Sequence, residues 1–223
     1  MVSLKSIVWL LAGVVGAVLQ LLLISVLLRG LYKKYPVLFL YVVVSFLMNV
    51  AESAEYWKLI QWSSFGVQLY WINEMIFQVL VFSTVISLIH RASAGLAARR
   101  SRTLLLVAGA ALVMGLSIAL PYTDVSLNRW MTEATRNLSF ASAVLNVLLW
   151  TRLLAQKQRD AELLMISGAF GVQTAGKAIG HSLRGLEIYN LGTPLVPITY
   201  LLSLLLLWLA LRRRAPALAR QVP

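Results

Sequence analysis

The chain has 223 residues, 60% of them hydrophobic and only 13% charged, and its mean hydropathy is +0.80. No water-soluble domain of this size needs so much apolar surface, so the composition predicts an integral membrane protein. A formal net charge of +12 would suit a nucleic-acid partner, but most of the basic residues lie in or near the connections on one side of the apolar runs, which argues against one. The sequence has no cysteine, and this rules out disulfides, thiolate nucleophiles and iron–sulfur ligation.

Seven apolar runs are long enough, at about 20 residues each, to cross a hydrocarbon core of roughly 30 Å. The first lacks a small-residue cleavage site and is expected to stay in the mature protein as a membrane anchor. Connections between the runs are short, so the sequence predicts one all-α domain over residues 1–223, a bundle of seven transmembrane helices with a basic tail at 212–223. In chain order the runs cover residues 7–28, 36–55, 70–90, 103–120, 137–155, 162–182 and 195–211.

Basic residues concentrate in alternate connections of this bundle. The positive-inside rule assigns that side to the cytoplasm, so the N-terminus is expected outside and the C-terminus inside. The same basic loops are expected to lie on anionic lipids, and the layout is typical of a bacterial cytoplasmic (inner) membrane protein. Fourteen of the 20 basic residues lie on that side: Arg29, Lys33, Lys34, Arg91, Arg99, Arg100, Arg102, Arg152, Lys157, Arg159, Arg212, Arg213, Arg214 and Arg220.

Polar side chains recur at helical spacing inside several of the apolar runs. The run 70–90 carries Glu74 and Gln78 four residues apart, where their side chains share a helix face. The run 103–120 is almost free of polar residues and is expected to face lipid. The other stripes are Tyr41, Ser45, Asn49 and Glu52 in 36–55, Arg136, Ser139, Ser142 and Asn146 in or just before 137–155, and Gln173, Lys177 and His181 in 162–182.

Polar groups inside a bilayer turn toward the bundle interior or a wet cavity, because exposure to hydrocarbon is costly. The stripes therefore predict a mixed-charge pocket that opens toward the outer side. The expected partner of Glu74 is Lys177 or Arg136. Buried ion pairs that only fix the helix register remain an alternative interpretation. The residues predicted to line the pocket and bind a ligand are Asn49, Glu52, Glu74, Gln78, Arg136, Gln173, Lys177 and His181.

The run 162–182 also has small residues at a spacing that lets helices approach closely. Gly176 and Gly180 are four residues apart, in the segment G-K-A-I-G. We expect this face to pack within the molecule rather than to form a dimer.

Known membrane-protein and enzyme motifs are absent. Seven helices with an outside N-terminus resemble the layout of rhodopsins and of G-protein-coupled receptors, but the last run has no lysine for retinal, and the E/D-R-Y and N-P-x-x-Y motifs are missing. His90 and His181 are expected at opposite faces of the membrane, which argues against a zinc site or a bis-histidine haem. No catalytic motif is present, so neither enzyme activity nor a cofactor is predicted.

Three classes of function remain. The favoured one is a non-enzymatic binding or sensing module that holds a small polar ligand or ion in the mixed-charge pocket. The second is an accessory or structural subunit of a larger membrane complex, in which the charges are buried ion pairs and the partner is another membrane protein or a second copy. A small-solute transporter is less favoured, since the inner halves of the runs are mostly Leu, Val, Ile and Ala and no internal repeat is visible.

Overall fold

The computed structural model describes residues 4–58, 64–92, 127–155, 160–186 and 189–212, together with isolated helical positions between 108 and 116. Within these ranges every element is a helix and no strand occurs, which confirms the all-α prediction. The elements are α1 (Leu4–Val26), a short π-helical turn η1 (Leu27–Leu31), α2 (Tyr32–Lys34), α3 (Pro36–Lys58), α4 (Ser64–Ala92), α6 (Leu127–Ala155), α7 (Ala161–Gly185) and α8 (Tyr189–Arg212).

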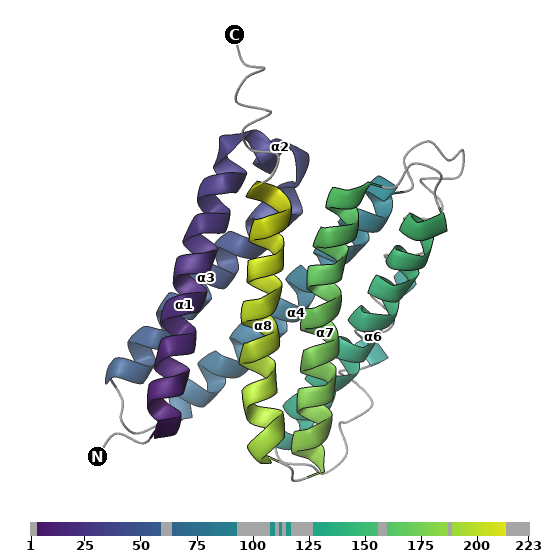
Figure 1. Ribbon diagram of the computed structural model, residues 1–223. Coiled ribbons are helices and arrows are strands. Elements are labelled where there is room, and N and C mark those ends of the chain that lie inside the picture. Colours follow the sequence, from purple (N-terminus) through teal and green to yellow (C-terminus); the bar gives the residue numbers. More distant parts are fainter. Residues whose placement is uncertain are drawn as a thin grey trace.

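The long helices form a closed ring (Figure 1). Each helix packs on the next in the order α1, α3, α4, α6, α7 and α8, and α8 returns to pack on α1. Helices α4 and α7 also touch across the ring. This arrangement puts residues far apart in the sequence, from the first to the last predicted run, around one shared interior.

Four of the described helices are long and apolar enough to cross a membrane. Their spanning segments are Ala12–Lys34, Pro36–Ser53, Trp71–Ala92 and Gly192–Arg212. They correspond to the first, second, third and last of the seven predicted runs, so by length and composition the structure supports four spans and not seven.

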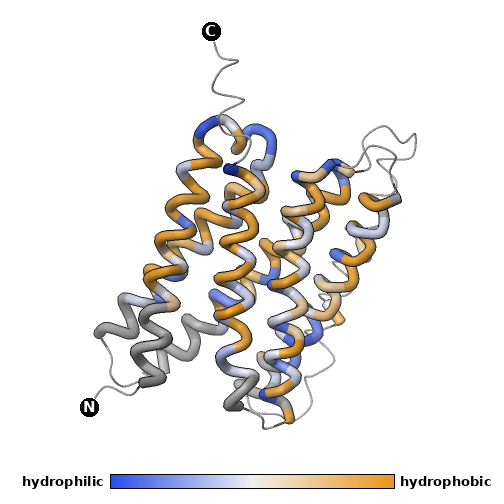
Figure 2. Tube along the Cα trace, in the orientation of Figure 1, coloured by the Kyte–Doolittle hydropathy of each residue, from blue (hydrophilic) through white to orange (hydrophobic). Residues whose placement is uncertain are grey.

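The other three predicted runs are not among these four segments, for two different reasons. The run 103–120 lies outside the described residues, apart from a few isolated helical positions. The runs 137–155 and 162–182 are helical, as α6 and α7, but polar residues lower the mean hydropathy of both helices, as their mixed colours show (Figure 2). These polar residues include Glu133, Arg136 and Asn146 in α6 and Glu162, Lys177 and His181 in α7.

The apolar core fills the part of the ring nearest α2. Leu27, Leu31, Leu88, Ile166 and Leu211 are all fully or almost fully buried there and belong to one continuous cluster. Burial of such side chains is the main source of packing in this part of the bundle. The polar residues of the ring interior therefore lie mostly in its other part.

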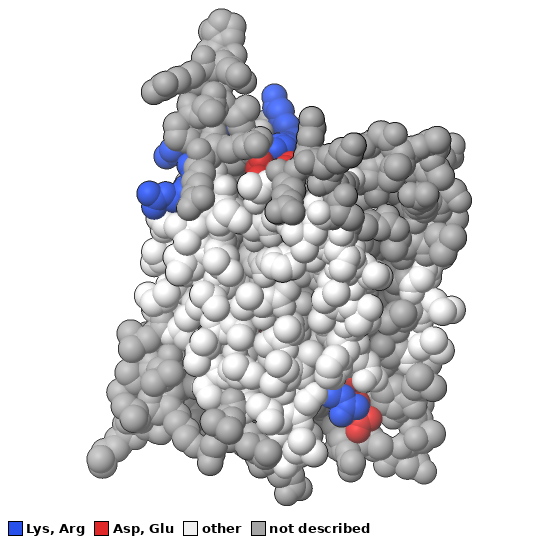
Figure 3. All heavy atoms as spheres, turned by 45° about the vertical axis from the view of Figure 1, so that its right-hand side comes forward, with Lys and Arg blue, Asp and Glu red and all other residues white. Residues whose placement is uncertain are grey.

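Charged side chains gather at the two ends of the bundle, and the belt between them on the face shown in Figure 3 is uncharged. At the α2 end, Lys34 Nζ lies 2.7 Å from Glu162 Oε2 and so joins α2 to the start of α7. Asp160 begins α7 as its N-cap, accepting hydrogen bonds from the backbone N–H groups of Glu162 at 3.0 Å and Leu163 at 3.3 Å. The chain reaches this end through Gly30, whose φ of 109° is readily adopted only by glycine.

Helices α7 and α8 approach closely over the predicted glycine face. A Cβ atom at Gly176 would overlap the side chain of Thr199, and one at Gly180 would lie 2.6 Å from Val196 Cγ2. On the opposing helix, a Cβ at Gly192 would lie 2.7 Å from the carbonyl oxygen of Gly180. The prediction that these glycines serve packing within the molecule is confirmed.

Candidate functional site

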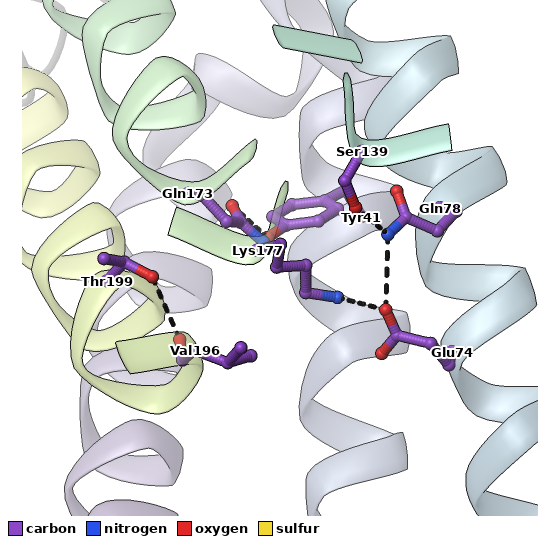
Figure 4. Close-up of polar contacts among 8 residues, drawn as sticks. All are labelled: Tyr41, Glu74, Gln78, Ser139, Gln173, Lys177, Val196 and Thr199. Atoms are coloured by element: carbon purple, nitrogen blue, oxygen red, sulfur yellow. Dashed lines mark hydrogen bonds and ion pairs between the residues drawn. The ribbon is translucent and has the colours of Figure 1, made fainter. Parts of the chain in front are cut away.

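An ion pair between α4 and α7 forms the centre of the candidate site. Lys177 Nζ lies 2.6 Å from Glu74 Oε1, and the two side chains are only 7% and 12% exposed (Figure 4). Of the two partners that the sequence predicted for Glu74, the structure thus selects Lys177. Arg136 of α6 is half-buried and makes no ion pair with Glu74 in the described part of the chain.

The ion pair has a polar and an aromatic neighbour on α4. The amide of Gln78 donates to Glu74 Oε1 at 3.2 Å and to Ser139 Oγ of α6 at 3.0 Å, which ties three helices together. Lys177 Nζ also lies 4.0 Å from the centroid of the Phe77 ring. The negative face of an aromatic ring attracts a cation, so Phe77 replaces part of the hydration that the ammonium group loses on burial.

A second group of polar contacts lies one helical turn along α7, at Gln173. Its Oε1 accepts hydrogen bonds from the hydroxyl of Tyr41 at 3.0 Å and from Ser203 Oγ at 3.2 Å. These donors come from α3, across the ring, and from α8, the neighbour of α7. The Tyr41 ring lies 5.4 Å, centroid to centroid, from Phe77, so the two polar groups share an aromatic wall.

Two buried side chains of α7 have polar atoms without partners. Gln173 Nε2 and both ring nitrogens of His181 make no hydrogen bond within the described residues, although the residues are only 1% and 2% exposed. A buried donor left unpaired costs about 1–3 kcal/mol, so native structures normally satisfy such groups. Gln173, Lys177 and His181 follow each other at four-residue spacing, so they lie along one face of α7.

The remaining predicted site residues lie elsewhere. Asn49 of α3 donates to the carbonyl oxygen of Gly13 at 3.2 Å and to Gln20 Oε1 at 3.1 Å, so it joins α3 to α1. Glu52 is exposed and accepts a hydrogen bond from Asn73 Nδ2 at 3.1 Å. The structure therefore brings together Glu74, Gln78, Gln173 and Lys177, with His181 one turn further along α7, and leaves Asn49 and Glu52 in contacts of their own.

The sequence did not predict some contacts of the site. Phe77 was not singled out, although it follows Glu74 by three residues and therefore shares its helix face. Tyr41 belongs to a predicted polar stripe, but neither Tyr41 nor Ser203 was assigned to the site. Their contact with Gln173 joins three helices, and no local spacing within one run predicts it.

A second charged cluster lies at the α2 end around Tyr35, a residue between the first two spanning segments. The Tyr35 ring lies 4.9 Å from Lys34 Nζ and 4.7 Å from the guanidinium carbon of Arg91, measured to its centroid. Burial raises the pKa of the Tyr35 hydroxyl well above its usual value, and the nearby Glu162 carboxylate raises it further. Tyr35 is therefore a neutral phenol whose ring packs against the cations of this end.

Comparisons with protein-family models, with curated proteins and with solved structures found no match to this chain. Among the described residues no group of three or more His, Asp or Glu side chains could hold a metal ion. The chemistry of the site consists of an ion pair, two amides, an imidazole, hydroxyl groups and aromatic faces. Such a set can bind a polar molecule by charge and hydrogen bonds.

Proposed function

We propose that this protein is a non-enzymatic binding or sensing module of the membrane, which holds a small polar ligand or ion beside the Glu74–Lys177 ion pair. The observation that supports this best is that Gln173 Nε2 and the ring nitrogens of His181 are buried on the same face of α7 as Lys177 and have no partner among the described residues. An ion pair that served packing only would need no such groups beside it. Unpaired buried polar atoms in a polar site are where a ligand gains hydrogen bonds.

We further propose that the whole chain crosses a bacterial cytoplasmic membrane seven times, with the N-terminus outside. The position of α6 and α7 in the same ring as the four apolar helices supports this, because α7 packs on α6 and α8 along with its contact to α4. In this orientation the α2 end, with Arg29, Lys33 and Arg212, faces the cytoplasm and anionic lipids. The ligand site then lies toward the outer side.

An accessory subunit of a larger membrane complex is the second candidate function. It is favoured by the exposed apolar face of α6, where Phe140, Val144 and Val147 are 48%, 60% and 60% exposed. Lipid or a neighbouring membrane protein would cover this face. A transporter is less well supported, because the apolar core closes the ring at the α2 end.

The decisive experiment is a thermal-stability screen of the purified protein in lipid nanodiscs. A library of small polar compounds is tested for its effect on the unfolding midpoint, followed through the fluorescence of the seven tryptophans. Compounds that bind the folded state raise the midpoint, and the stabilisation grows with the logarithm of their concentration above Kd. We expect at least one class to do so in the native protein but not in the double variant Glu74→Gln with Lys177→Met.

The ion pair between Lys34 and Glu162 supplies a matched control. Lys34→Met with Glu162→Gln removes an ion pair of similar length at the α2 end, away from the site, and should leave the ligand response unchanged. A library without any stabilising compound would contradict the binding function. Recovery of a stoichiometric protein partner in mild detergent would then favour the subunit.

A further inference from the structure

We propose that the ligand is a small oxyanion, such as a carboxylate, which accepts hydrogen bonds from Gln173, Lys177 and His181 along one face of α7. This inference rests on the proposed binding function and narrows it to one chemical class. Its basis is the balance between donors and acceptors at the site.

Two acceptor oxygens of the site, Glu74 Oε1 and Gln173 Oε1, are already in use. Glu74 Oε1 accepts from Lys177 Nζ at 2.6 Å and from Gln78 Nε2 at 3.2 Å. Gln173 Oε1 likewise accepts from two hydroxyl groups, those of Tyr41 and Ser203. A ligand that came with further donors would therefore find these oxygens occupied.

The donors, by contrast, are in surplus. Gln173 Nε2 carries two N–H groups and has no acceptor among the described residues. A neutral His181 carries a single N–H, on one of its two ring nitrogens. Neither nitrogen has a partner among the described residues. Lys177 has three N–H groups, of which one is accounted for by Glu74. A ligand with several acceptor atoms would satisfy all three residues, and oxyanions offer the strongest acceptors.

The charges along this face point the same way. Glu74 balances Lys177, and Arg184 follows His181 by three residues, with its Nε buried and unpartnered in the described structure. Glu52 of α3 also interacts electrostatically with this ion pair, so the excess positive charge lies at the His181 end of the face, beside Arg184. A bound anion would offset it, whereas a bound cation would add to it.

A cationic ligand is the contrasting class. It would have to use Glu74 Oε2, which lies outside the contacts drawn in Figure 4. It would also compete with Lys177, whose ammonium group already occupies the carboxylate and the Phe77 ring. The unpartnered donors of Gln173 and His181 would remain unpaired.

The test measures binding of sodium acetate, succinate, phosphate and sulfate against methylammonium and choline chloride, at constant ionic strength. The protein is held in zwitterionic nanodiscs, so that lipid charge does not contribute. We expect saturable stabilisation by one or more of the oxyanions and none by the amines. The variant His181→Leu should bind the oxyanion about tenfold more weakly while its unliganded stability is unchanged or higher, because an unpaired buried donor has been removed.

Two further variants make the test specific. Gln173→Glu keeps the oxygen that accepts from Tyr41 and Ser203 but replaces the free donor with an anion, so oxyanion binding should be lost. Ser142→Ala removes another buried, unpartnered hydroxyl, on α6, and should leave binding unchanged. Stabilisation by amines and not by oxyanions would overturn this inference and leave the binding function standing. Equal oxyanion effects in all variants would overturn it as well, whereas no stabilisation by any polar compound would remove the binding function itself.

Discussion

At the scale of single residues, Lys177 is the side chain whose position most needs an explanation. An ammonium group inside an apolar bundle loses its hydration, and this is costly unless other groups replace it. The structure supplies the carboxylate of Glu74 at 2.6 Å and the ring of Phe77 at 4.0 Å. Gln78 in turn holds the carboxylate in place from the same helix as Glu74.

The energetic coupling of this ion pair can be measured by a double-mutant cycle. We expect Lys177→Met and Glu74→Gln to lower the free energy of unfolding by about 3 kcal/mol each, because each leaves the other group buried without its partner. The double variant should recover most of that loss, since both charges are then gone. The measurement is the unfolding free energy in detergent, and additive losses would contradict direct coupling.

At the scale of elements, α7 is the helix that organises the bundle. One of its faces carries Gln173, Lys177 and His181, and another carries the glycines that allow α8 to approach. The face toward α8 has no room for a larger residue, because a Cβ at Gly176 would overlap Thr199. Helix α7 thus carries both the polar residues of the candidate site and the glycines that pack against α8.

This close approach predicts a large difference between two glycine substitutions. Gly176→Ala should lower the unfolding free energy by roughly 1–3 kcal/mol, since overpacking forces Thr199 or the backbone to move. Gly109→Ala is the matched control, because a Cβ there meets nothing within 4 Å and alanine favours the helix. Thermal unfolding of the two variants side by side checks this, and similar midpoints would show that α7 and α8 are not in close contact.

The start of α7 depends on its N-cap. Asp160→Ala removes the side-chain acceptor of two backbone N–H groups and should cost about 1 kcal/mol of unfolding free energy. Asp160→Asn keeps a side-chain oxygen at the cap and should retain most of the stability. A loss of the same size in both variants would mean that the charge of Asp160 matters more than the hydrogen bonds.

At the scale of the whole molecule, the topology across the membrane is open to a direct test. The start of α7 is tied to Lys34 by the Glu162 contact, and a helix of 25 residues is about 37 Å long. Tyr32 and Leu186, which are 38% and 70% exposed, are therefore at opposite ends of the bundle.

Single cysteines at these two positions can be labelled selectively, because the native chain contains none. In intact cells with a permeable outer envelope, an impermeant maleimide should label Leu186→Cys directly. It should label Tyr32→Cys only after the inner membrane is opened. The unmodified chain gives the background, and labelling of both positions from outside would contradict the proposed orientation.

The sequence by itself determined the helical class, the stripes of polar residues and Lys177 as one of two expected partners of Glu74. Hydropathy and helical periodicity are local properties, which a run of about 20 residues already contains. Hydropathy is a poor guide at α6 and α7, because the polar residues of these two helices lower it. By length and composition, four spans and not seven are therefore supported.

Only the tertiary structure decided which stripes face each other. Lys177 and not Arg136 meets Glu74, Asn49 turns to α1, and Tyr41 and Ser203 reach Gln173 from different helices. These contacts depend on the order of helices around the ring and on the rotation of each about its axis. Packing between distant segments sets both, because each helix must bury its own apolar face and satisfy its polar groups at the same time.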